Sequence, residues 1–343
     1  MNKLFVPLTL LPTMIAAAPF AHAAPVVYKL VHKFPLASAG GWDYLTADSH
    51  GRRIYIANTD QVLVVNIDTG KLIGKISGTS GVHGIALDSK LNRGFTSNGR
   101  ANSVTVFNME TLKTITDIPV GAMPDAIVFD PATDRVFTFN GRDQSATAID
   151  AKTDTVIGTI PLPGRPEFPV VDGQGHIYDN IEDENEIVAI NSKTLRMENT
   201  WPTAPGTEPS GISMDVKHHR LFSLCHNQTM IVMDSITGKV VATPAIGNGP
   251  DAAAFDPKFH YAFSPNGSDG TLTVIEEQTP DTYTIVGTFP TQVGARTIAW
   301  DEKTHRILSV TANVQAPAPN APTQPRWRRS YVPGTFVLLE YGR

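Results

Sequence analysis

An aspartate recurs along most of this chain at intervals of 40 to 45 residues, each time closing a short apolar run. The seven aspartates are Asp48, Asp88, Asp130, Asp172, Asp215, Asp256 and Asp301. In the first unit, residues 41–78, Gly, Asp, Asn or Thr separates four apolar or β-branched runs of strand length. The runs are Trp42–Ala47, Arg53–Ala57, Val62–Ile67 and Lys71–Ser77. A four-strand unit with this period is typical of one β-propeller blade. We therefore predict an all-β fold, a seven-bladed β-propeller of four-stranded antiparallel blades.

The two ends of the chain complement each other. The last unit begins at Thr297–Trp300 and ends at Thr335–Tyr341, and by count it lacks one outer strand. An apolar segment before the first unit, residues 26–37, supplies a strand for it. Pairing the ends within one blade removes the open sheet edges that a propeller would otherwise expose. We expect residues 24–343 to form a single propeller that the N- and C-terminal strands close; a loose N-terminal strand is the alternative.

The first residues have the pattern of a targeting segment. Lys3 gives a positive start, Leu4–Phe20 is an apolar run, and Ala21-His22-Ala23 is a small-residue cleavage site. We predict that residues 1–23 are a signal peptide cleaved after Ala23, and that the protein is periplasmic or secreted. No other stretch is apolar for long enough to predict a membrane span.

Charge and cysteine content narrow the function classes. Without Lys3, 27 basic side chains stand against 33 acidic ones, so the formal charge is −6. This balance gives no reason to expect nucleic acid or an anionic membrane as a partner. Cys225 is the only cysteine, so an internal disulfide is excluded, and stability must come from packing between blades and from ring closure. We expect a monomer.

A set of mostly polar, charged side chains stands five residues before each repeated aspartate. The set is Asp43, His83, Asp125, Glu167, Ser210, Asp251 and Arg296. Because the first strand of a blade lines the central channel, these side chains should ring its mouth. Carboxylates that gather in this way raise one another's pKa unless a cation intervenes. We therefore predict a site for a small polar molecule or a divalent metal, with Asp43, His83, Asp125, Glu167 and Asp251 as the hypothetical metal ligands.

A structural interpretation of the same positions stays open. An aspartate after Gly or Pro at the start of a strand often bonds to backbone N–H groups of its own turn. A residue type that changes from Asp to His, Glu, Ser and Arg around the ring favours binding over a purely structural repeat.

The loops between the second and third strands of each blade should lie on the same face. They carry Asn58, Asn98, Asn140, Asn180 and Asn266, which we interpret mostly as turn formers, with Arg100 and Arg142 close behind. In the fifth unit this position is Cys225, followed by His226. We expect a buried thiol; a Cys-His nucleophile or soft-metal site is the alternative. The turns on the opposite face carry His50, His176, His218, His219, His260 and His305, and a repeated turn position explains these better than ligation.

One segment breaks the repeat. Residues 313–334 form a Pro-rich connection in the seventh blade, and their prolines exclude a helix and a central strand. Loops of this length are usually functional or disordered. Trp327 and Arg328 lie in this loop, which we interpret as a lid or a cationic, stacking surface for an anionic ligand.

The repeat itself resembles a known family. The second strands read IYIAN at Ile54–Asn58, GFTSN at Gly94–Asn98 and VFTFN at Val136–Asn140, and a V-x-V-x-(D/N)-x-x-T pattern follows at Val62–Thr69. With Pro124-Asp125 and Pro250-Asp251 between blades, nearly all of the mature chain resembles exported YVTN-repeat, or YncE-like, seven-bladed propellers. The strict motif is lost in repeats four to seven. The resemblance implies relatives that are surface-layer or periplasmic binding propellers, one class associated with single-stranded DNA, and distant lactonases and a metal-dependent antibiotic lyase.

Three functions follow from these features. The first is a binding propeller whose channel mouth takes a small polar ligand, a metal ion or a protein partner through Asp43, His83, Asp125, Glu167, Asp251, Arg296, His226, Trp327 and Arg328. The second is a metal-assisted hydrolase or lyase at the same mouth, with a divalent cation as Lewis acid. The third is a scaffold for protein or single-stranded nucleic acid. The sequence contains no G-x-S-x-G elbow, H-E-x-x-H helix or P-loop that would decide the question.

Overall fold

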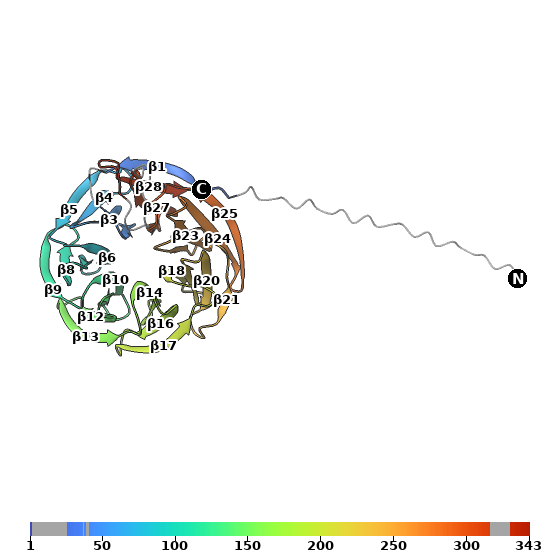
Figure 1. Ribbon diagram of the computed structural model, residues 1–343, viewed down its shortest axis with the longest axis horizontal. Helices are drawn as coiled ribbons and strands as arrows, with labels where there is room; N and C mark the ends of the chain where they lie inside the picture. Colours follow the sequence, from blue (N-terminus) through green and yellow to red (C-terminus); the bar gives the residue numbers. More distant parts are fainter. Residues whose placement is uncertain (2–25, 37, 39–40, 316–329) are drawn as a thin grey trace, which may run out of the picture.

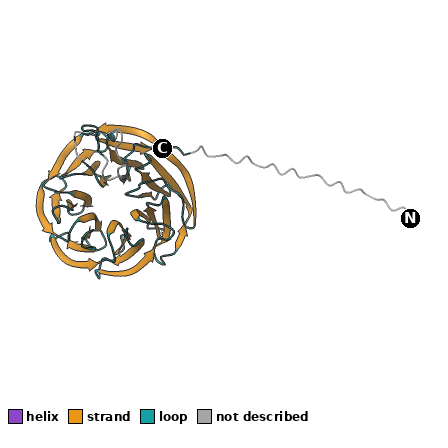
Figure 2. Ribbon diagram, viewed as in Figure 1, coloured by secondary structure: helices purple, strands orange, loops and turns teal. Residues whose placement is uncertain are grey.

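The computed structural model describes residues 1, 26–36, 38, 41–315 and 330–343. These described residues form seven four-stranded antiparallel sheets around a central axis, as Figure 1 shows in a view along it. Figure 2 shows that strands joined by loops make up the ring. The predicted fold class is confirmed.

The first three blades follow the chain in order. Blade 1 contains β2 (Leu45–Asp48), β3 (Arg53–Asn58), β4 (Gln61–Asn66) and β5 (Leu72–Ser77). Blade 2 contains β6 (Val82–Asp88), β7 (Arg93–Asn98), β8 (Ser103–Asn108) and β9 (Thr114–Pro119). Blade 3 contains β10 (Pro124–Asp130), β11 (Arg135–Asn140), β12 (Ser145–Asp150) and β13 (Thr155–Pro161).

The next three blades repeat this order. Blade 4 contains β14 (Pro166–Val171), β15 (His176–Ile181), β16 (Glu186–Asn191) and β17 (Arg196–Pro202). Blade 5 contains β18 (Pro209–Asp215), β19 (Arg220–Cys225), β20 (Thr229–Asp234) and β21 (Val240–Ala242). Blade 6 contains β22 (Ala254–Asp256), β23 (Tyr261–Asn266), β24 (Thr271–Thr279) and β25 (Thr282–Pro290).

The seventh blade joins the two ends of the chain. It contains β26 (Ile298–Asp301), β27 (Arg306–Thr311), β28 (Val337–Gly342) and, as its outer strand, β1 (Lys29–Pro35). β1 and β28 are antiparallel, with Lys29 opposite Gly342 and Pro35 opposite Val337, and lie side by side in Figure 1. The predicted pairing of the terminal strands is confirmed.

The core lies between the blades. Each of seven hydrophobic clusters among the described residues joins two neighbouring blades, and the cluster between blades 3 and 4 also includes Tyr44 and Ala252 from other blades. In β3, Ile54 and Ile56 pack toward blade 7, and Tyr55 and Ala57 pack toward blade 2. Successive side chains of a strand point to opposite faces, so an uninterrupted apolar run supplies both interfaces of its blade. Burial of each large apolar side chain stabilises the folded state by about 2 kcal/mol. The many such side chains between blades stabilise a fold that has no internal disulfide.

The repeated aspartates hold the turns at one end of the innermost strands. Asp88 Oδ1, for example, accepts hydrogen bonds from the backbone N–H groups of Lys90 and Leu91 at 3.0 and 3.1 Å. The residue just before each second strand has a positive φ. His219, His260 and His305 occupy this left-handed position, as their assignment to a repeated turn predicted.

One local prediction is wrong. The first strand of blade 1 begins at Leu45, not Trp42, because the backbone N–H of Tyr44 leaves the regular ladder and donates to His83 O at 3.2 Å. The loop asparagines are buried at strand ends and begin turns, as Asn98 O does by accepting from Ala101 N at 3.1 Å. The Asn98 side chain also ties the second strand of its blade to the third, because its Nδ2 donates to Thr105 Oγ1 at 2.8 Å.

Candidate functional site at the channel mouth

Irregular strand starts aim the predicted ring residues at the axis. His83, Asp125 and Glu167 each lie at a β-bulge in the first strand of their blade, where the pairing register shifts by one residue. A bulge bends the strand and re-aims the side chains at it. Asp43 and Arg296 lie just before β2 and β26, where regular pairing has not yet begun.

These side chains share one cavity of about 530 Å³. Its lining comprises Gly41, Trp42, Asp43, Tyr44, His83, Asp125, Glu167, Asp251, Arg296 and Tyr331. The structure therefore brings together six of the seven side chains that the spacing places at the mouth. The seventh, Ser210, is buried, and its hydroxyl lies 3.4 Å from the backbone oxygen of Asp251.

His83 lies between two carboxylates. Its Nδ1 atom is 2.6 Å from Asp43 Oδ2 and 3.3 Å from Asp125 Oδ1. Burial lowers the pKa of His83, but the hydrogen bond to Asp43 and the charges of Asp125 and Asp43 outweigh burial and raise this pKa to about 9. The imidazole is therefore a cation at neutral pH and partly neutralises both carboxylates.

Arg296 neutralises the other side of the ring. Its guanidinium pairs with Asp251 through Nε and with Asp43 Oδ1 at 3.2 Å, and it donates to Trp42 O at 2.9 Å. The Arg296 side chain is only 19% exposed, so water has little access to these ion pairs. Together, Arg296 and His83 hold Asp43 from two sides.

Asp125 and Glu167 are held less firmly in their ionised form. Burial raises the pKa of Asp125, and the charge of His83 lowers it. The charges of Asp43 and Asp251 raise it further, so that the pKa of Asp125 is about 6. Burial and the neighbouring carboxyls of Asp125 and Glu182 raise the pKa of Glu167 well above its usual range. The cavity thus contains carboxyls that a cationic partner would ionise.

A second hollow, of about 620 Å³, adjoins the cavity. It shares Trp42, Asp43, His83 and Arg296 with the cavity and adds Arg100 and Arg142 at its rim. The two predicted arginines therefore lie on the ring face, beside the carboxylates. This face therefore adds two arginines to the His83 and Arg296 that already lie among the carboxylates.

His226 lies in a side hollow of about 510 Å³ that also contacts Glu167. Its Nδ1 is 3.9 Å from Glu182 Oε1 and 3.7 Å from Glu208 Oε2. Cys225 is fully buried, and burial raises the pKa of its thiol to about 12. The thiol is protonated at neutral pH, which supports the interpretation of a buried cysteine and argues against a Cys-His nucleophile.

The described part of the Pro-rich loop reaches the mouth. Tyr331 lines the cavity and packs on Trp42, with the ring centroids 4.5 Å apart. It also forms an isolated bridge with Val314 at the other end of the loop. Trp327 and Arg328 lie outside the described residues.

Sequence reasoning missed Tyr44, Tyr331 and Glu182 as part of the mouth. Tyr44 follows a ring residue directly, and Glu182 follows the second strand of blade 4, so their places in the repeat were the available signals.

Three atoms from Asp43, His83 and Asp125 lie within 4.8 Å of one another, so these residues are also a candidate metal group. The described part of the chain contains no helix with the length and hydropathy that a membrane span requires.

Comparisons with known proteins give a fold and no family. No protein-family model matches the chain, and the comparison with curated proteins found no match. Among solved structures, a chain of Kuenenia stuttgartiensis Hydrazine Synthase is similar, with a TM-score of 0.70 and 15% sequence identity. The alignment covers 79% of this chain and 92% of that chain. At this identity the likeness shows the fold alone.

Proposed function

We propose that this protein is a binding propeller that takes a small polar ligand in the channel-mouth cavity. The observation that carries the proposal is the gathering of Asp125, Glu167 and Asp251 in one cavity whose described lining supplies one Arg and one His as counter-charges. A cationic group would ionise Asp125 and Glu167 and gain from both. The adjoining hollow offers Arg100 and Arg142 to a negative group. The best ligand is therefore a small zwitterion, with its positive end at the axis.

Thermal shift and calorimetry test this proposal with three probes: free amino acids, an α,ω-diamine and a dicarboxylate. We expect the amino acids and the diamine to raise the melting temperature and the dicarboxylate to leave it unchanged. Glu167→Gln combined with Asp125→Asn removes the cation-binding groups, so the shift should disappear. Glu110→Gln, an exposed residue in a turn of blade 2, is the matched control and should keep it. No shift with any probe, or a shift that survives the double substitution, contradicts the proposal.

A metal-assisted hydrolase or lyase is the second candidate. The observation in its favour is the triplet Asp43, His83 and Asp125, whose ligand atoms lie within 4.8 Å of one another. A bound divalent cation would act there as a Lewis acid. Elemental analysis of protein purified without metal-affinity resin or chelator tests this candidate. One metal per chain that is lost in His83→Asn supports it; retention of that metal in His83→Asn contradicts it.

We further propose that the protein is an exported member of the YVTN-repeat propellers. The support is the amino-terminal pattern of residues 1–23 and the repeated strand motifs such as Ile54–Asn58. Expression of the full chain in a bacterium, followed by fractionation and mass spectrometry, tests the export. A mature protein that begins at Ala24 in the periplasm or medium is expected; an uncleaved cytosolic chain contradicts it.

A further inference from the structure

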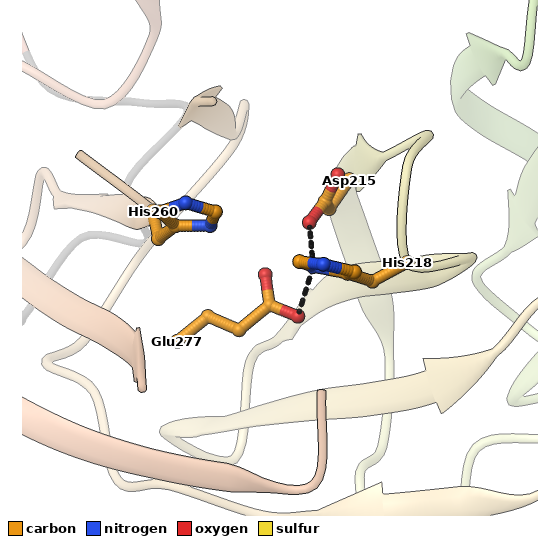
Figure 3. Close-up of side chains that lie close together, drawn as sticks. All are labelled: Asp215, His218, His260 and Glu277. Carbon is orange, nitrogen blue, oxygen red and sulfur yellow. Dashed lines mark ion pairs between the residues drawn. The ribbon is translucent and has the colours of Figure 1, made fainter. Parts of the chain in front are cut away.

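A second polar cluster lies at the opposite end of the innermost strands, between blades 5 and 6. It contains Asp215, His218, His260 and Glu277, and Figure 3 shows the four side chains gathered together. Asp215 ends β18, His218 follows in the turn, His260 precedes β23, and Glu277 lies near the end of β24. Ser210, near the other end of β18, contacts Asp251 of the channel mouth, so the two sites lie toward opposite ends of one strand.

The four side chains converge closely. His218 Nδ1 lies 2.7 Å from Asp215 Oδ2 and 3.3 Å from Glu277 Oε1. The His260 ring stacks on His218 with centroids 5.8 Å apart. One ligand atom from each residue lies within 4.8 Å of every other. Four donors from two blades are thus arranged around a common centre.

The atoms that face this centre are buried and lack hydrogen bonds. Asp215 and Glu277 are only 2% and 4% exposed. Among the described residues, Asp215 Oδ2, His218 Nδ1 and both carboxyl oxygens of Glu277 have no hydrogen-bond partner of acceptable geometry. Buried polar atoms without partners are rare and costly, because nothing replaces the water they lose. A bound cation would satisfy all four at once.

Glu277 departs from the repeat at a buried position. The backbone N–H of Glu277 donates to His260 O at 2.8 Å, and the same bond recurs in the five preceding blades. The residues that donate there are Ile67, Met109, Ala151, Ser192 and Ser235. These are apolar or small, as expected beside a core. Only in blade 6 does this bond place a carboxylate there, and it faces the repeated aspartate of the preceding blade.

The turn geometry of the repeat does not explain the cluster. One blade further on, the equivalent pair is complete in itself: His305 Nδ1 lies 3.2 and 3.1 Å from the two carboxylate oxygens of Asp256, and both contacts are hydrogen bonds. Asp215 already caps its own turn through Oδ1, which accepts from Lys217 N at 2.9 Å. Its Oδ2 atom instead faces His218 Nδ1, at 2.7 Å, so blade 5 adds His218 and blade 6 adds Glu277 to the pair that the repeat provides.

We propose that Asp215, His218, His260 and Glu277 form a binding site for a first-row divalent transition metal that clamps blade 5 to blade 6. Two imidazoles and two carboxylates are a donor set that zinc and its neighbours accept and that hard cations, which prefer oxygen alone, do not favour. Ligand atoms around a tetrahedral zinc lie about 3.4 Å apart, from bond lengths of about 2.0–2.2 Å. Small side-chain rotations therefore close the site. The His218 side chain is 23% exposed, which leaves a route for the ion.

Titration of chelator-treated full-length protein with Co²⁺ and Zn²⁺ tests the site. We expect one equivalent of Co²⁺ to give the visible absorption of a four-coordinate site, Zn²⁺ to displace it, and Zn²⁺ to raise the melting temperature. Glu277→Gln and His218→Asn each remove one donor. Both should weaken the metal affinity by at least about 100-fold, since loss of an outer-shell partner alone costs 10–100-fold. Far-UV circular dichroism and the melting temperature without metal confirm that each variant folds.

Two matched variants keep this site distinct from the others. His305→Asn changes the equivalent turn residue of the next blade, and His83→Asn changes the channel mouth. Both should keep the Co²⁺ absorption and the Zn²⁺ stabilisation of the wild type. Absence of the four-coordinate spectrum in the wild type, or its loss in His83→Asn with retention in Glu277→Gln, overturns the proposal. The zwitterion binding proposed for the mouth is measured separately and stands or falls independently.

Discussion

The channel mouth and the cluster between blades 5 and 6 carry similar residues with different counter-charges. At the mouth, Asp43 is held by both His83 and Arg296, in a cavity open to water. At the opposite end, Glu277 is buried and its carboxyl has no hydrogen bond among the described residues. The difference teaches that a gathering of Asp, Glu and His defines no function by itself. A network that both an Arg and a His neutralise suits a polar ligand, whereas a buried cluster in which His218 alone of the described side chains pairs with Asp215 and Glu277 suits the proposed metal ion.

Loss of a charge at the mouth should have the largest effect on stability. Arg296→Ala leaves Asp43 and Asp251 without their guanidinium in a largely buried position. We expect the free energy of unfolding to fall by about 2–4 kcal/mol, as for other broken buried ion pairs. Chemical denaturation measures it. Arg142→Ala, on the same face, is the control and should change it little; an equal loss in both variants would mean that the network contributes no stability of its own.

Loss of a charge at the opposite end should have the reverse sign. Burial and the neighbouring Asp215 raise the pKa of Glu277 to about 8, so at neutral pH without metal this group destabilises the folded state. In chelator, Glu277→Gln should raise the free energy of unfolding by about 1–3 kcal/mol, because the amide removes the cost of keeping a proton on a buried carboxyl that ionises in the unfolded chain. Because the folded-state pKa is raised, the gain should grow between about pH 4.5 and pH 8.

Glu340→Gln is the matched control for the predicted rise in the free energy of unfolding. Glu340 is also buried, but its carboxylate pairs with Arg306 Nη1 at 2.9 Å and His32 Nδ1 at 2.6 Å. Its replacement should therefore destabilise the protein, by about 1 kcal/mol or more. Destabilisation by both Glu→Gln changes in the absence of metal would remove the distinction between the two sites.

The pH dependence of stability should reveal the state of His83. Its pKa is raised to about 9, so its stabilising contribution is fully present below about pH 6.5 and is lost as pH rises through about 9. We expect His83→Gln to be less stable than the wild type at pH 6 and to approach it at pH 10. Denaturation curves across this range measure the difference. A gap between the two proteins that does not change with pH would show that His83 is not protonated in the folded state.

The rim of the mouth should give the smallest effect. Arg100 pairs with Asp60 at 3.2 Å, but both side chains are more than half exposed. Arg100→Ala should therefore change the free energy of unfolding by less than about 0.5 kcal/mol, as exposed ion pairs do. Any larger loss of zwitterion affinity in this variant would then report on the ligand and not on folding.

Much of the fold was predictable because it depends on local signals. A repeated aspartate caps each turn, and alternating or continuous apolar runs fill both interfaces of a blade, so their period gave the blade number and the closure of blade 7. The wrong prediction concerns a position where two blades meet. Residues 42–44 look like the start of a strand in sequence, but the backbone N–H of Tyr44 donates to His83 O of the next blade.

The candidate mouth was predictable in its members and not in its charges. The spacing from the repeated aspartate identified Asp43, His83, Asp125, Glu167, Asp251 and Arg296 as neighbours. Which carboxylate pairs with His83 or Arg296 depends on β-bulges and interatomic distances that no pattern encodes. The histidines of the opposite cluster fit a repeated turn position in the sequence, and the signal that sets the cluster apart is Glu277, where blades 1 to 5 carry an apolar or small residue.

The chain alone determined the number of blades, the closure of the ring and the end of the channel at which each polar residue lies, because these follow from periodicity and strand direction. Only the folded structure decided which of those residues neutralise one another. That outcome depends on contacts between residues distant in sequence, such as Asp43 with Arg296 and His218 with Glu277, and on how much water each contact excludes.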